Sequence, residues 1–283
     1  MGKETGIAWT NHTFNPWWGC LKVSPGCEHC YAEHLAVVRR KLPVWGPAAT
    51  TERRRTESPW KDLPKWNAAA GRDGVRRRVF VASMADIFED HPMVTAWRVE
   101  ALRLLERCTN LDVQLLTKRP RNILQMVPVE WLTAWPSHVW VGTTVEDQRR
   151  AEERVPFLLQ VPARVRFLSV EPLLEAVDLR AYLGGMARHE RAGHAASCDG
   201  SCFDLPTVSW VIVGGESGRG ARPFRQEWAA SVVGQCVAAH VPVFMKQMGS
   251  NPHDGPAPMK FKHPTGADPS EWPSMLRRQE FPR

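Results

Sequence analysis

Six short apolar runs, rich in β-branched residues, recur along the chain and constrain its fold more than any other feature. They are Val79–Ala82, Val113–Leu116, Val139–Val141, Val165–Val170, Val208–Val213 and Val243–Met245. Near-continuous runs of this kind are typical of parallel strands that are covered on both faces. With a first strand near residues 7–14, they indicate about seven β-α units of roughly thirty residues each.

Helical patterns lie between these runs. They cover Met93–Cys108, Arg121–Trp131, Glu146–Gln160 and Arg225–His240. The alternation predicts an α/β fold, a complete or partial (β/α) barrel with about six to seven parallel strands. An open doubly wound sheet is the alternative. We predict one barrel domain over residues 1–250, with insertions at about 43–75 and 184–207, followed by an irregular tail over residues 251–283.

The chain carries no apolar run long enough to span a membrane and no apolar core of a signal peptide near its N-terminus. We therefore expect a cytoplasmic protein without membrane contacts. Thiols stay reduced in that compartment, so clustered cysteines indicate metal binding or catalysis before disulfides.

Polar residues follow the predicted strands directly. Those that we single out are Ser83, Asp86, Lys118, Arg119, Glu171 and Glu216. The carboxyl ends of parallel strands carry the sites of barrels and of open α/β sheets alike, so these residues are candidates for ligand binding. For each one, a salt bridge at the mouth of the barrel is the alternative.

Three of the seven cysteines lie within eleven residues, at Cys20, Cys27 and Cys30. Two thiols separated by two residues can face one point, and a third nearby completes a three-point cradle. Three thiolates suit a four-iron cluster with one iron left open. They also suit zinc if His29 or His34 supplies a fourth ligand. The spacing alone leaves both open.

The same stretch resembles the cluster loop of radical S-adenosylmethionine enzymes, closest to the branch that includes spore photoproduct lyase. The residues that carry the resemblance are Asn15, Pro16, Trp17, Gly19, Cys20, Cys27, Cys30, Tyr31 and Ala32. This chain has six residues between its first two cysteines, where the family usually has three. Over most of residues 5–250 the chain is also similar to the phage three-Cys-motif proteins, through the phrases LLTKRP, FLSVEPLL and WVIVGGESGRGARP.

The resemblance implies an iron–sulfur enzyme that generates a 5′-deoxyadenosyl radical from S-adenosylmethionine and receives its electron from a donor. It implies a 4Fe-4S cluster on the three cysteines, and Tyr31 beside the adenine. Lys118 and Arg119 would contact a carboxylate or phosphate, Glu171 the ribose, and Glu216 the methionine amine. Ser83 and Asp86 follow the second predicted strand, where the family normally carries its motif for the methionine amine. The gene would belong to a bacterial host, a phage or a prophage; the resemblance names no substrate or catalytic residue.

Basic residues are concentrated early in a chain of net charge +7, at 39–41, 53–55 and 76–78. Trp45, Trp60 and Trp66 are interleaved with them. Cations that neutralise phosphates, beside rings that stack on bases, are typical of nucleic-acid grooves. We therefore expect a nucleic-acid substrate, DNA before RNA, that is modified or repaired. A solvated face with core tryptophans is the alternative.

Two other kinds of protein remain open: a zinc-stapled, non-catalytic nucleic-acid-binding protein, and an enzyme of the same radical chemistry on a small molecule or peptide. A second group of possible ligands is His189, His194, Cys198 and Cys202. Two histidines and two cysteines at short spacing meet the ligand count of a zinc site. The alternative is an incidental surface loop. Cys108 and Cys236 fall on helical patterns and are predicted to be core residues.

Overall fold

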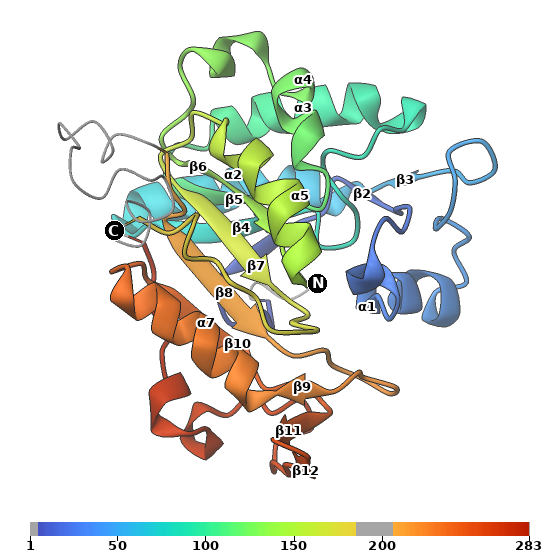
Figure 1. Ribbon diagram of the computed structural model, residues 1–283. Helices are drawn as coiled ribbons and strands as arrows, with labels where there is room; N and C mark the ends of the chain where they lie inside the picture. Colours follow the sequence, from blue (N-terminus) through green and yellow to red (C-terminus); the bar gives the residue numbers. More distant parts are fainter. Residues whose placement is uncertain (1–4, 185–205, 283) are drawn as a thin grey trace, which may run out of the picture. The chain divides into compact units, whose positions relative to one another are not determined.

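The computed structural model describes residues 5–184 and 206–282 (Figure 1). It confirms the predicted α/β fold of the partial β/α-barrel kind, with seven parallel strands in the described residues. The chain divides into two compact units, Met1–Thr143 with Val161–Arg164 and Thr144–Gln160 with Val165–Arg283. No helix in the described residues is long and apolar enough to cross a membrane.

The first unit is built on four parallel strands. They lie in the order β1 (His12–Phe14), β4 (Arg77–Val81), β5 (Leu111–Thr117) and β6 (Val139–Thr144). Val79, Val81, Val113 and Leu115 are fully buried. The apolar runs thus form strands where the sequence predicted them, and their carboxyl ends share one edge.

Helices of the first unit bury apolar faces against these strands. In α3 (Thr95–Glu106), Ala101, Leu102 and Leu105 are fully buried at helical spacing. In α2 (Ser58–Asp73), Trp66 stacks on His12 with ring centroids 4.5 Å apart. The helix ends where Gly74 takes a left-handed conformation with φ of 66°.

The structure adds detail to one prediction for this unit and corrects another. The predicted insertion at about 43–75 contains a helix, α2, in its second half. The predicted helix over residues 121–131 shrinks to α4 (Ile123–Met126) between two 3-10 turns, Pro120–Asn122 and Val129–Leu132. Pro128 accounts for the break, since the residue before a proline disfavours helix and Val127 is extended with ψ of 160°.

The cysteine segment follows β1 and is mostly irregular. It begins with β2 (Trp17–Trp18), which pairs antiparallel with β3 (Arg54–Arg55). A 3-10 turn over Pro25–Cys27 follows, then α1 (Tyr31–Glu33), which continues into a π-helical turn over His34–Arg39. Ala32 and Ala36 pack with Val44 and Met84 in a small core of their own, which anchors this helix to the first unit.

The second unit has three parallel strands, in the order β7 (Arg166–Val170), β8 (Trp210–Gly214) and β10 (Val243–Gln247). Its helices in the described residues are α5 (Gln148–Leu159) and α7 (Gln226–Ala238). Both agree with the predicted helices. In α5 the side chain of Asp147 caps the first turn by accepting from the Arg150 N–H at 2.8 Å.

The C-terminal tail is more regular than predicted. It contains β11 (Pro252–Asp254) and β12 (Ala257–Pro258), which form a small sheet with β9 (Phe224–Arg225). Two 3-10 turns follow, Pro269–Glu271 and Ser274–Leu276. The last residues then run beside β10, where the Met245 N–H donates to the Arg278 carbonyl at 2.8 Å.

Candidate functional site

The loop that carries Cys20 is tied to the strand-end loops of the first unit by its backbone. The Gly19 N–H donates to the Met84 carbonyl at 3.0 Å, and the Gly46 N–H donates to the Cys20 carbonyl at 3.0 Å. Gly19 has φ of 117°, and a Cβ there would lie 2.4 Å from the Val44 carbonyl oxygen. Only glycine fits at this position, which explains the residue that precedes Cys20.

The three thiols are free and partly accessible. The Cys20 thiol contacts the Leu21 carbonyl at 3.5 Å, and Cys27 Sγ lies 3.9 Å from Ser24 Oγ. Cys30 occupies the N-cap position of α1. In the described part of the chain, no three His, Cys, Asp or Glu side chains are placed to hold one metal ion. The thiols therefore share a loop without converging on a point.

Asp86, just beyond β4, is the hub of the polar contacts at this edge. Its carboxylate accepts from Thr117 Oγ1 at 2.6 Å, from Arg119 Nη1 at 2.8 Å, and from the Lys118 and Phe88 N–H groups at 3.0 Å each. Burial alone raises the pKa of Asp86. The Arg119 charge and the four hydrogen bonds outweigh burial and hold the pKa below its usual value, so the group is an anion.

Lys118 and Arg119 follow β5 and act on different thiols. Arg119 Nη1 lies 3.7 Å from Cys20 Sγ, and Nη2 donates to the Leu21 carbonyl at 2.8 Å. Burial raises the pKa of Cys20 to about 12, against the lowering effect of Arg119. Burial also raises the pKa of Cys30, which the Lys118 charge partly offsets. The two predicted ligand-binding cations thus belong to the surroundings of the cysteines.

Tyr31 and Ser83 are connected across the same edge. The Tyr31 hydroxyl donates to the Ser83 carbonyl at 2.8 Å, while the Tyr31 ring remains 56% exposed. Asn15 Nδ2 donates to Ser83 Oγ at 3.0 Å, and Asn15 Oδ1 accepts from the Met84 N–H at 2.9 Å. The exposed ring therefore has a fixed orientation beside Cys30, since its hydroxyl is anchored.

The first unit thus brings together eight of the predicted residues: Cys20, Cys27, Cys30, Tyr31, Ser83, Asp86, Lys118 and Arg119. A buried ion pair that the sequence analysis did not identify supports them. Arg53 donates from Nε and Nη2 to the two carboxylate oxygens of Glu89, at 2.9 and 2.8 Å. Arg119 Nη2 lies 3.8 Å from Glu89 Oε1, so the pair borders the site. The sequence around Arg53 and Glu89 contains no pattern that predicts this ion pair.

Two predicted residues belong to the second unit. Glu171 follows β7, and its Oε1 lies 3.3 Å from Lys246 Nζ at the end of β10. A Cβ on Gly214 would lie 2.4 Å from that oxygen, so the glycine gives the carboxylate its space. Glu216 is engaged by Arg222, whose Nη2, Nε and backbone N–H donate to it at 2.6, 3.1 and 2.9 Å. Glu216 therefore stabilises the loop between itself and Arg222, six residues further along the chain.

Four of the eight arginines in the three basic runs have carboxylate partners, Arg53 among them. Arg55 pairs with Glu100 at 2.8 Å and lies over the Trp60 ring. Arg76 pairs with Asp112 at 2.7 Å, and Arg77 pairs with Asp73. The tryptophans contribute to packing, because Trp60 lies against Phe14, Trp66 against His12, and Trp45 in the small core under α1. Residues 39–41, by contrast, are exposed.

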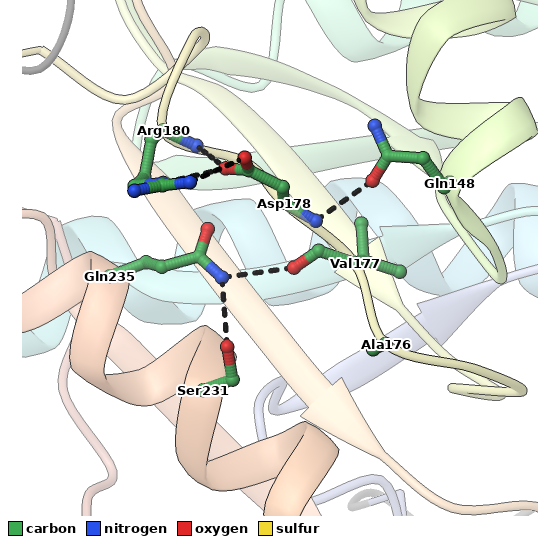
Figure 2. A pocket seen from close by; sticks show the side chains of 7 residues that line it. All are labelled: Gln148, Ala176, Val177, Asp178, Arg180, Ser231 and Gln235. Atoms are coloured by element: carbon green, nitrogen blue, oxygen red, sulfur yellow. Dashed lines mark hydrogen bonds and ion pairs between the residues drawn. The ribbon is translucent and has the colours of Figure 1, made fainter.

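Figure 2 shows a cavity of about 540 Å³ in the second unit, lined by Gln148, Ala176, Val177, Asp178, Arg180, Ser231 and Gln235. Its polar side chains bond mainly to one another and to the backbone, as Gln235 does with the Val177 carbonyl at 2.9 Å. None of the predicted site residues lines this cavity. The possible zinc ligands His189, His194, Cys198 and Cys202 lie outside the described residues.

Comparison with known proteins gives one result of substance. No match was found among curated proteins or among solved structures. A family model described as "Protein of unknown function (DUF5131)" matches residues 4–275, which is nearly the whole chain and includes every predicted site residue. The chain therefore belongs to the DUF5131 family.

Proposed function

We propose that this protein is an iron–sulfur enzyme of the radical S-adenosylmethionine type, with Cys20, Cys27 and Cys30 as ligands of a 4Fe-4S cluster. The observation that carries the proposal is the placement of Cys20 and Cys30, on the loop that also carries Cys27, beside two cations that follow β5. Arg119 lies 3.7 Å from Cys20 Sγ, and Lys118 acts on Cys30. Burial raises the pKa of both thiols, and each cation acts against burial by lowering the pKa of its thiol, toward the thiolate form that binds iron.

The donor set matches a cluster by its chemistry and its count. Three thiols on one loop suit a four-iron cluster that leaves one iron open. Each thiolate binds a different iron, so the three sulfurs need not meet at one point, as the ligands of a zinc ion must. The short turn over Pro25–Cys27 also lets Cys27 adjust without disturbing a strand.

The residues of this chain would hold and shield the reacting groups. When bound, the cluster and S-adenosylmethionine supply a 5′-deoxyadenosyl radical after reduction by an external electron donor. The anchored Tyr31 ring offers a flat surface for a planar base, because its hydroxyl bond to Ser83 removes its rotational freedom. The Asp86 carboxylate keeps Arg119 in place.

The test is anaerobic purification followed by iron and sulfide analysis and by electron paramagnetic resonance of the reduced protein. We expect about four irons and four sulfides per chain, and none in the Cys20→Ala, Cys27→Ala or Cys30→Ala variants. His34→Ala and Cys236→Ala serve as matched controls and should load normally. Loaded protein should release 5′-deoxyadenosine from S-adenosylmethionine under reduction. Colourless protein with one zinc at these cysteines would contradict the proposal.

We further propose that the substrate is a nucleic acid. Fewer basic residues support this proposal than the sequence suggested, because four of them are paired with carboxylates: Arg53, Arg55, Arg76 and Arg77. It comes from Arg39–Lys41, an exposed basic run that directly follows the helix carrying Tyr31. Exposed cations release counterions when they contact phosphates, so binding should weaken steeply with salt.

This part is tested by binding of single-stranded DNA and RNA at several salt concentrations. A triple variant, Arg39→Gln with Arg40→Gln and Lys41→Asn, should lower both the affinity and the salt slope. Asn suits position 41, where φ is 58°. A double variant, Arg76→Gln with Arg77→Gln, is the control and should change the slope less. Absence of salt-dependent binding in the parent protein would favour a small-molecule or peptide substrate.

A further inference from the structure

The guanidinium of Arg119 is held in place before any ligand arrives. Nη1 donates to Asp86 Oδ2 at 2.8 Å, Nη2 donates to the Leu21 carbonyl at 2.8 Å, and the backbone N–H donates to Thr117 Oγ1 at 2.8 Å. Its side chain is only 13% exposed. Arg119 is therefore poorly placed to contact a soluble carboxylate or phosphate, which is the role that the sequence predicted for it.

The sulfur of Cys20 lies within the donor range of this fixed group. The distance from Arg119 Nη1 to Cys20 Sγ is 3.7 Å, which suits an N–H···S contact. Two acids share the charge of Arg119, because Asp86 Oδ2 accepts from it at 2.8 Å and Glu89, which is paired with Arg53, lies 3.8 Å away. Arg119 thus presents a fixed guanidinium N–H to one of the three thiols.

We propose that Arg119 tunes the iron–sulfur cluster through Cys20, and that Asp86 positions Arg119 for that contact. This inference rests on the proposed function. A hydrogen bond or a positive charge at a ligand sulfur stabilises the reduced, more negative cluster and so raises its reduction potential. Cys20 becomes the ligand that carries an arginine contact, whereas Cys30 receives the backbone N–H groups of Ala32 and Glu33 and the charge of Lys118.

The test is the midpoint potential of the loaded cluster, measured by redox titration with electron paramagnetic resonance detection. Arg119→Gln removes the charge and should make reduction about tenfold less favourable, a fall of about 59 mV for a one-electron couple. Arg119→Lys keeps the charge but loses the fork and should fall between Gln and the parent. Asp86→Asn removes a nearby anion, which by itself would raise the potential, so a fall in potential would support the positioning role of Asp86 and a rise would overturn it. Arg76→Gln is the surface control and should leave it unchanged.

Iron content separates the possible failures. A parent protein that binds no cluster overturns the proposed function and this inference together. A parent and an Arg119 variant that load equally and share one potential overturn the inference alone. A purely structural role would reduce loading while the loaded fraction kept the parent potential, which also counts against it. If Arg119→Gln does not load, Arg119→Lys and Asp86→Asn decide the outcome by the same measurement.

Discussion

Replacing Arg53 by Met should destabilise the first unit more than any surface change, because this arginine is a fully buried cation. Its side chain has 0% exposure and lies 2.8 Å from Glu89 Oε1. Its remaining N–H groups donate to backbone carbonyls of the loop over residues 44–52. The acceptors are Val44, Gly46, Thr51 and Glu52, at 3.1, 2.8, 3.3 and 3.3 Å. The methionine would fill similar volume but would satisfy none of these acceptors.

The magnitude follows from the charge that remains. Removing one partner of a buried ion pair costs about 3–5 kcal/mol, because the other charge is left without compensation. Arg119 Nη2 lies 3.8 Å from Glu89 Oε1 and compensates part of it. We therefore expect a loss near the lower end, about 3 kcal/mol in the free energy of unfolding. Adding Glu89→Gln removes the orphaned charge, so the double variant should lose less than the sum of the two single variants.

The assay is urea unfolding of the full chain, followed by tryptophan fluorescence. Arg149→Met is the matched control, because Arg149 pairs with Glu153 at 2.7 Å on an exposed helix face and should show no measurable change. Cluster loading is a second readout, since the loop that Arg53 holds carries Trp45, the bridge partner of Cys20. A loss for Arg53→Met below about 1 kcal/mol, as for an exposed pair, would refute the reasoning.

Three further changes test other parts of the structure. Gly19→Ala should lower the free energy of unfolding by roughly 1–3 kcal/mol through backbone strain alone. Its Cβ would also lie 2.4 Å from the Val44 carbonyl oxygen. Gly74→Ala, which has open space around it, should cost less in the same urea assay. Burial lowers the pKa of His138 below 6.5, so the protein should lose stability as the pH falls below 6.5, and His138→Asn should flatten that slope in unfolding measured between pH 7.5 and 5.5. Phe281→Ala should cost about 2 kcal/mol because a half-buried ring leaves its contact with Trp210, at 5.5 Å between centroids, and an unchanged urea midpoint would contradict this.

The strands were predictable because each one is a short run of consecutive apolar residues between polar residues. Such a run can be identified without knowing which distant segments pack against it. Helix α2 was not predictable, since its buried positions include Leu63 and Ala70 among Pro64, two tryptophans and several charged residues that hide the period. Pro64 is tolerated inside the helix, although proline normally argues against one. The helix expected over residues 121–131 failed for the opposite reason, because its apolar spacing ignored the effect of Pro128.

At the site, the sequence predicted that residues after the strands would gather at one edge but not what they would contact. Parallel strands bring their carboxyl ends to one edge, so Asp86 and Arg119 were expected to be neighbours. Their partnership at 2.8 Å, and the approach of Arg119 to Cys20, depend on side-chain directions that no pattern encodes. The same limit applies to the arginine triplets, whose carboxylate partners lie 4–45 positions away along the chain.

The three thiols differ in how the fold holds them, and this difference bears on how a cluster would fit. Cys20 is fixed by distant parts of the first unit, through the Gly19 bond to Met84, the bridge to Trp45 and the Arg119 contact. Cys27 lies on a local 3-10 turn whose N–H donates only three positions back, at 2.9 Å to Ser24. A loop held rigidly at one end and locally at the other adjusts at the second end. Cys20 would therefore set the place of the cluster, and Cys27 would move to meet it.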